Sequence, residues 1–191
     1  MNAVLKATLT PPPPDPETVM RYARGRLDAA TKPLLDACVR EATPLLQYAV
    51  CYLECDVTVS ENEVDLGALR IRSADLAAHL QGRARAVIFT ATVGAGVDRL
   101  IARTARTSPA KALLFDALAT ERVEALCDAF TARYTAPHRR FSPGYGDLPL
   151  EFQRDIFAVL DCPRRIGVTL CENLLMVPTK SVSAIVGVEK Q

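Results

Sequence analysis

The sequence predicts an α+β fold, in which a single layered domain packs helices against a mostly antiparallel sheet. First, 191 residues with 49% hydrophobic side chains suffice for one domain with a sizeable core. Second, helical and strand patterns are interspersed along the chain without an internal repeat. Third, hairpin signals at residues 47–72 and 165–188 require antiparallel pairing, which argues against a doubly wound parallel sheet.

The N-terminal segment predicts a strand followed by a spacer. The opening MNAVLKATLT alternates weakly, as an edge strand does, and PPPPDP at 11–16 has prolines that donate no ladder hydrogen bonds. We therefore divide the chain into an N-terminal strand and proline-rich spacer at 1–16 and a folded domain at 17–191.

Two helices follow the spacer. Asp15 predicts a helix N-cap with Pro16 in the first turn, and Gly25 can end that helix. Thr31 repeats the arrangement with Pro33, and apolar residues recur at helical spacing up to residue 43.

The middle of the chain predicts strands. Residues 48–60 and 61–73 predict two antiparallel strands around a turn at 61–63. Ser73 then caps a short helix that ends at Gly82, and an apolar strand leads into a turn at Gly94 and Gly96.

The remaining elements alternate in type. Residues 96–105 and 108–134 predict two helices, the second opened by Ser108 and Pro109, and residues 150–161 predict another. Residues 165–190 predict two strands around a turn at Pro178.

Composition limits the function. The 23 basic and 22 acidic residues give a formal charge of +1, so no net field favours nucleic acid, and no apolar run approaches the ~20 residues of a membrane span. Six scattered cysteines without a CxxC pair, and no secretory signal, predict free thiols in a reducing cytoplasm. Cys51 and Cys55 would share the buried face of a strand rather than bind a metal.

Most of the residues that could form a catalytic or binding site are better explained as structural residues. The glycine turn after residues 87–92 lacks the third glycine of GxGxxG and the GK[ST] of a P-loop, which favours a tight strand-to-helix turn with Asp98 in its first helical turn. We expect His79 and His138 to be surface residues rather than members of a catalytic triad. Glu121 and Glu124 predict a solvated pair on one helix face.

The loop RFSPGYGDLP at 140–149 is different, since its residues suit a small charged ligand. Arg140 offers a planar fork for a carboxylate, Gly144 permits close backbone approach, and Tyr145 offers a ring face and a hydroxyl. Pro143 and Pro149 would hold the loop in shape before binding. On these residues alone, an irregular surface connection remains the alternative.

The motifs after residue 140 carry a family resemblance. An R-x-x-x-G-Y element at 140–145 is followed by an amphipathic helix with Ile156, Phe157 and Leu160, and then by IGVTLCENLLMVPTKSVSAIVG at 166–187. This order, with its Glu, Met-x-Pro and Ser-x-Ser, resembles the activation (reactivation) domain of vitamin B12-dependent methionine synthase, in its short, free-standing form. The resemblance is strongest over 140–187 and extends more loosely back to about residue 20.

The resemblance implies binding of S-adenosylmethionine. The resemblance implies that Arg140 would pair with the methionine carboxylate and that Glu124 would contact the ammonium or ribose. It also implies that Gly144 and Tyr145 would form the wall of the loop. Glu172, in C-E-N where the family has T-E-S, is implied as a supporting residue. The family loop usually continues with A-C-P-D, whereas this chain has Asp147, Leu148, Pro149 and Leu150 after Gly146.

The resemblance also implies an accessory part in a cobalamin-dependent methyltransferase activity. Methyl transfer from a sulfonium to cobalt(I) needs proximity and orientation rather than acid or base help, so no catalytic residue and no metal ligand is expected in this chain. Cobalamin would be carried by a partner, either a split methionine synthase or another corrinoid methyltransferase, with electrons from a flavodoxin-like or ferredoxin-like protein. The alternatives are a docking or regulatory subunit that has lost the ligand and, with little support from the residues, a free-standing small-molecule enzyme.

Overall fold

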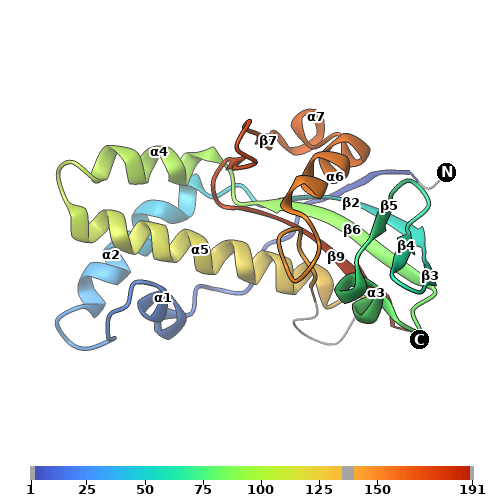
Figure 1. Ribbon diagram of the computed structural model, residues 1–191. Coiled ribbons are helices and arrows are strands. Elements are labelled where there is room, and N and C mark those ends of the chain that lie inside the picture. The colour runs from blue at the N-terminus through green and yellow to red at the C-terminus, as the bar shows by residue number, and fades with distance from the viewer. Residues whose placement is uncertain (1–2, 135–139, 190–191) are drawn as a thin grey trace.

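A four-stranded antiparallel sheet forms the centre of the computed structural model, which describes residues 3–134 and 140–189 (Figure 1). Its strands lie in the order β1 (Leu5–Ala7), β2 (Ala49–Asp56), β6 (Arg85–Thr92) and β9 (Ser181–Gly187). β2 pairs with β6 over its whole length, and β6 pairs with β9. The predicted α+β class with a mostly antiparallel sheet is confirmed, and β1 is the predicted edge strand.

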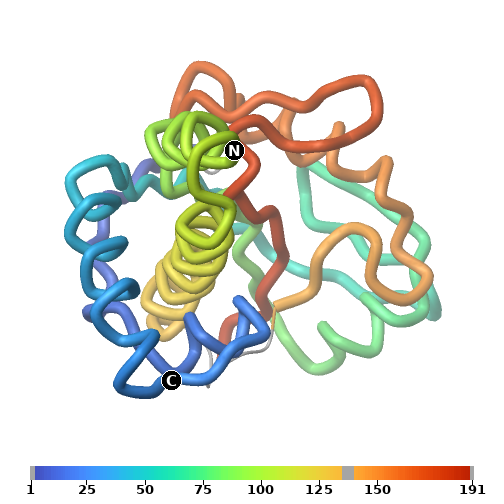
Figure 2. The backbone as a smooth tube through the Cα atoms, turned by 90° about the vertical axis from the view of Figure 1, so that its left-hand side faces the viewer, coloured from blue at the N-terminus to red at the C-terminus, as the bar shows by residue number. Residues whose placement is uncertain are grey.

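Four helices pack together beside the sheet. They are α1 (Pro16–Tyr22), α2 (Lys32–Ala42), α4 (Ala95–Thr104) and α5 (Pro109–Thr131). Viewed along its axis, α5 runs through the middle of this group, with the other three around it (Figure 2). Leu35, Leu100, Phe115 and Leu118 are among the buried residues of their shared core. A helix that is buried on several sides has apolar residues around much of its circumference. The buried residues of α5 follow this pattern.

The two faces of the sheet follow the period of two expected for strands. On β6, Val87, Phe89 and Ala91 face the C-terminal half of α5, where they meet Leu126 and Phe130. The alternate residues of the sheet face the opposite way into a second core. That core includes Cys51 and Cys55 of β2, Ala86 and Ile88 of β6, and Ile185 of β9. The two cysteines therefore share one buried face, as their spacing predicts.

Short elements cover this second face. They are β3 (Thr58–Ser60), β4 (Glu63–Asp65), β5 (Arg70–Arg72), α3 (Ala74–Leu80), α6 (Gln153–Leu160), α7 (Cys162–Ile166), β7 (Thr169–Leu170) and β8 (Met176–Val177). Two short 3-10 helices adjoin α-helices: Thr43–Leu45 directly follows α2, and Leu150–Phe152 directly precedes α6. The sequence pattern did not predict α7.

The first predicted hairpin forms only at its tip, where β3 pairs with β4, and the second pairs differently in the structure. Residues 63–72 do not pair with β2: β4 and β5 form a separate three-stranded sheet with β3, around the expected turn at Glu61. Similarly, β8 pairs with β7, whereas β9, on the other side of Pro178, pairs with β6. The physical reason is burial, because β6 is apolar on both faces and takes the long strands β2 and β9 as its two neighbours.

Of the four predicted helix caps, those at Asp15 and Ser73 are present, and Thr31 and Ser108 make no side-chain hydrogen bond to the first turn. The Asp15 carboxylate accepts from the backbone N–H of Thr18, and the Ser73 hydroxyl accepts from that of Leu76. Thr31 makes no such bond, because its hydroxyl donates to the Arg26 carbonyl in the preceding turn.

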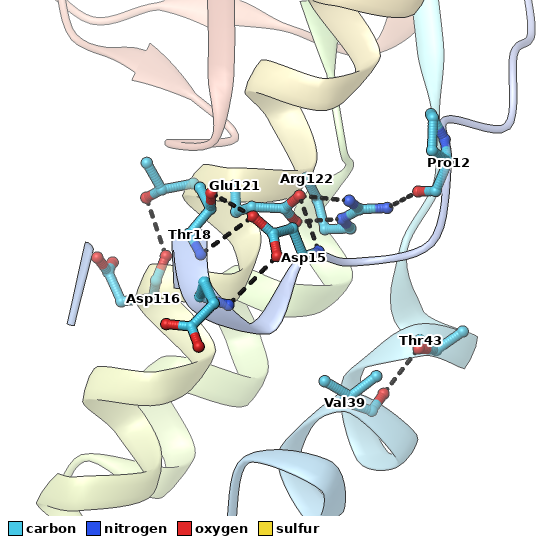
Figure 3. A network of polar contacts seen from close by, with 10 residues as sticks. Pro12, Asp15, Thr18, Val39, Thr43, Asp116, Glu121 and Arg122 are labelled. Carbon is cyan, nitrogen blue, oxygen red and sulfur yellow. Dashed lines mark hydrogen bonds and ion pairs between the residues drawn. The ribbon is translucent and has the colours of Figure 1, made fainter. Parts of the chain in front are cut away.

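Glu121 is buried, which corrects the prediction of a solvated pair with Glu124. Both its carboxylate oxygens accept from the neighbouring Arg122 guanidinium at 2.5 Å, and only 7% of the Glu121 side chain is exposed (Figure 3). Arg122 also donates to the Pro12 carbonyl, and Glu121 accepts from the backbone N–H of Asp15 at 3.4 Å. This ion pair ties the proline-rich segment to α5.

The described residues contain neither a membrane-length apolar helix nor a group of three or more His, Cys, Asp or Glu side chains placed to hold a metal ion.

Candidate functional site

A pocket of about 350 Å³ lies where the segment after residue 140 meets α5 and β9. Its volume falls within the range of small-molecule sites. Residues from five parts of the chain line it: Glu124, Arg140, Ser142, Pro143, Tyr145, Leu150, Gln153, Met176, Ser181, Val182 and Ser183.

Backbone pairing positions Arg140. The next residue, Phe141, exchanges two hydrogen bonds with Ile185 of β9, at 2.9 and 2.8 Å, so residues 140–141 extend the sheet edge. Successive residues of an extended segment point to opposite faces. Phe141 accordingly packs with the second core and lies 5.3 Å from the His79 ring, whereas the Arg140 side chain points toward α5.

On α5, two carboxylates meet the Arg140 guanidinium. One Nη atom of Arg140 donates to Glu124 at 2.7 Å and lies 3.1 Å from an Asp128 oxygen. The two acids are one helical turn apart and so share a face. Arg140 is only 15% exposed, whereas Glu124 is 38% exposed and opens to the pocket. Burial raises the pKa of Cys127, behind this pair, to about 12, so its thiol is neutral.

The loop that follows has a closed geometry. Gly144 has a φ of +91°, which favours glycine, and its N–H donates to the Leu148 carbonyl at 2.9 Å. The Leu148 N–H donates back to the Tyr145 carbonyl at 2.9 Å. Tyr145 lines the pocket and is 57% exposed, with its ring edge-on to Phe141. Gly144 thus shapes the loop that presents Pro143 and Tyr145.

The wall formed by β8, β9, Leu150 and Gln153 contains both polar and apolar side chains. Ser181 and Ser183 alternate on β9, and the Ser183 hydroxyl is 3.5 Å from the side-chain oxygen of Gln153, the first residue of α6. Met176 of β8 and Leu150 supply the apolar part. The wall therefore combines hydroxyl groups with a soft apolar surface.

Glu172 lies apart from the other predicted residues. It is exposed in the turn between β7 and β8 and is not among the residues that line the pocket. Its backbone carbonyl accepts from the Arg154 guanidinium at 3.0 Å. The structure thus brings Glu124, Arg140 and Tyr145 together, with Gly144 in the same loop, and leaves Glu172 outside.

Several site residues were not assigned from the sequence. Asp128 follows Glu124 by four positions on a predicted helix, a spacing that was available as a signal. The Ser-x-Ser and Met-x-Pro elements were recognised as family motifs, but their place in the pocket depends on how β8 and β9 fold back. Gln153 carried no signal in the sequence.

A family model and a solved structure are similar to this chain. The family described as "Vitamin B12 dependent methionine synthase, activation domain" matches residues 130–191, which include Arg140, its loop and β9. No curated protein matches the chain.

Among solved structures, the chain is similar to a crystal structure described as the MetH reactivation domain bound to AdoHcy. The TM-score is 0.70 at 14% identity, over 100% of this chain and 80% of the other. At this identity the similarity shows a shared fold. The C-terminal third of the chain therefore matches the vitamin B12-dependent methionine synthase activation domain family, and the chain as a whole has the fold of a reactivation domain.

Proposed function

We propose that this chain is an S-adenosylmethionine-binding reactivation protein that supports reductive methylation of cobalamin on a separate protein. The partner would be a split methionine synthase or another corrinoid methyltransferase. Electrons would come from a flavodoxin-like or ferredoxin-like donor. The observation that carries the proposal is the pocket in which Arg140, Glu124 and Tyr145 converge. Arg140 and Tyr145 belong to the segment that matches the family, and Glu124 lies just before it on α5.

The charges near the pocket fit this ligand. The methionine end of S-adenosylmethionine carries an ammonium and a carboxylate, and its sulfonium gives the molecule one net positive charge. Arg140 with Glu124 and Asp128 carries one net negative charge. Arg140 would bind the carboxylate through donors that Glu124 leaves unused, and Glu124 would take the ammonium or ribose.

The remaining lining suits the rest of the ligand. Tyr145 offers an exposed aromatic face, Met176 and Leu150 offer apolar contact, and Ser181 and Ser183 offer hydroxyls. Glu172 is proposed only as a supporting residue, since it lies outside the lining.

The chain's own contribution would be to bind and orient. When bound, S-adenosylmethionine supplies an activated methyl group, and its transfer to the corrinoid of a docked partner requires alignment rather than proton transfer. The Arg140 guanidinium, held between Glu124 and Asp128, would orient the ligand for this transfer.

Calorimetric titration with S-adenosylmethionine tests the proposal. We expect saturable binding, and we expect Arg140→Ala to weaken it by about ten- to a hundredfold, because a hydrogen bond to a charged group is worth about 1.5–3 kcal/mol. Arg164→Ala is the matched control, since that side chain is 86% exposed and outside the pocket. No binding by the unchanged protein, alone or with a cobalamin-binding methyltransferase, would refute the ligand and favour a docking subunit.

A further inference from the structure

The pocket loop is joined to α3 by reciprocal contacts across 72 positions of sequence. The Asp147 carboxylate accepts from the backbone N–H groups of Ala74, at 2.7 Å, and Asp75, at 3.2 Å, and from the Ser73 hydroxyl. In return, the backbone N–H of Asp147 donates to the Asp75 carboxylate at 3.0 Å. Each segment therefore supplies a carboxylate to the backbone of the other.

These contacts complete the first turn of α3. The first N–H groups of a helix have no partner within it. Ser73 satisfies that of Leu76, and Asp147 satisfies those of Ala74 and Asp75. The hydroxyl of Ser73, followed by these backbone groups, lowers the pKa of Asp147, so its carboxylate is ionised at neutral pH.

Gly146 is the residue that lets the two segments approach. Its φ is +51°, and a Cβ at this position would lie 2.1 Å from the Asp75 Oδ2 atom. Gly146 separates Asp147 from Tyr145, the exposed aromatic residue of the pocket. The contacts to α3 therefore act two residues from the pocket wall.

We propose that Asp147 is a positioning residue: with Asp75 and Ser73 it forms a latch that holds residues 142–149 in shape before the ligand arrives. The inference rests on the proposed function, because it assigns the latch to the same pocket. A loop that is already ordered loses less conformational freedom on binding, so the latch increases affinity without touching the ligand. Asp147 occupies the first of the four positions at which the family usually has A-C-P-D, a motif that this chain lacks.

Hydrogen exchange and calorimetry on the full chain test the latch together. In Asp147→Ala we expect the loop amides of Gly144 and Leu148 to exchange about tenfold faster, and the Kd for S-adenosylmethionine to rise about three- to tenfold. Gly146→Ala should do the same by its clash with Asp75 while leaving the Asp147 carboxylate in place. Asp56→Asn, an exposed change at the end of β2, is the matched control.

The comparison with Arg140→Ala separates positioning from direct contact. That variant should lose ligand affinity with unchanged exchange in residues 142–149. Wild-type exchange and a wild-type Kd in both Asp147→Ala and Gly146→Ala would overturn the latch. If the unchanged protein binds no S-adenosylmethionine, the proposed function fails, and loop exchange still decides the latch: faster exchange in both variants supports it, and unchanged exchange overturns it.

Discussion

The Arg140 guanidinium donates to the Glu124 carboxylate at 2.7 Å across 16 positions of sequence, and this pair lies at one side of the pocket. Asp128 stands 3.1 Å from the same nitrogen. A cation held between two acids keeps a defined direction, and the surplus negative charge attracts a cationic ligand.

Glu124→Gln should therefore change selectivity between two related ligands. S-adenosylmethionine carries a sulfonium charge that S-adenosylhomocysteine lacks, so removing one negative charge should weaken the first more, by roughly 1 kcal/mol or about fivefold after allowance for solvent screening. Paired calorimetric titrations measure the ratio of the two Kd values. Glu61→Gln, in the exposed turn between β3 and β4, should leave the ratio unchanged. An equal loss for both ligands would contradict the charge argument.

Arg140→Lys should behave almost like Arg140→Ala toward the ligand. Lysine keeps the charge but loses the planar fork that contacts Glu124 and leaves donors for a carboxylate. We expect roughly tenfold weaker binding of S-adenosylmethionine with little change in the urea midpoint. Full affinity in the lysine variant would show that charge alone matters.

The buried ion pair on α5 should dominate local stability. Glu121→Gln leaves Arg122 without its charged partner in a site where 3% of the arginine side chain is exposed. Breaking such a pair costs about 3–5 kcal/mol, measurable by urea unfolding. Glu124→Gln on the same helix, at 38% exposure, is the comparison and should cost under about 1 kcal/mol. Equal losses would contradict the argument that the more buried ion pair is the more costly to break.

Among the aromatic residues in the core between α5 and the sheet, Phe130 should reduce the free energy of unfolding most when it is truncated. Its ring is fully buried and contacts Phe89, Tyr52 and Tyr134 at centroid distances of 5.0, 5.1 and 5.6 Å. Phe130→Ala should destabilise by about 3–5 kcal/mol. Leu113→Ala, at a position 53% exposed on the same helix, should cost well under 1 kcal/mol.

Thiol chemistry should distinguish one cysteine from the other five. Cys171 is exposed, and the remaining five cysteines are buried. A thiol reagent should modify about one group per native chain and all six after denaturation. Cys171→Ser should abolish the native reaction. Rapid reaction of further thiols in the native protein would contradict the packing of the sheet.

Buried thiols should also make the protein less stable in alkali. Burial raises the pKa of both Cys55 and Cys127 to about 12, whereas an unfolded cysteine ionises near pH 8.5. As pH rises from about 9 toward 12, the unfolded state loses these protons first, so stability falls. Thermal midpoints between pH 7 and 10.5 measure the effect, and Cys127→Ala should reduce it. A flat profile would contradict it.

Much of the fold could be predicted because local patterns are strong. The caps at Asp15 and Ser73, the long helix at 108–134 and the apolar strand before Gly94 all follow from short stretches of sequence. The strand pairings that differ from the prediction share one cause. Alternation predicts that a segment is a strand, but partner choice depends on which strands are buried on both faces, and that follows from the whole chain.

The candidate site divides in the same way. The loop residues Arg140, Gly144 and Tyr145 are recognisable from their types and spacing, since side-chain chemistry and glycine's freedom at positive φ are local properties. Three features required the tertiary structure: Glu121 is buried while Glu124 lines the pocket, Ser181 and Ser183 line the same pocket as Tyr145, and Asp147 caps a helix 72 positions earlier. By itself, the sequence determined the class of fold, the loop and its chemistry. Only the tertiary structure decided which residues meet at the site and which are buried, because contacts between distant residues depend on how all the elements are arranged in space.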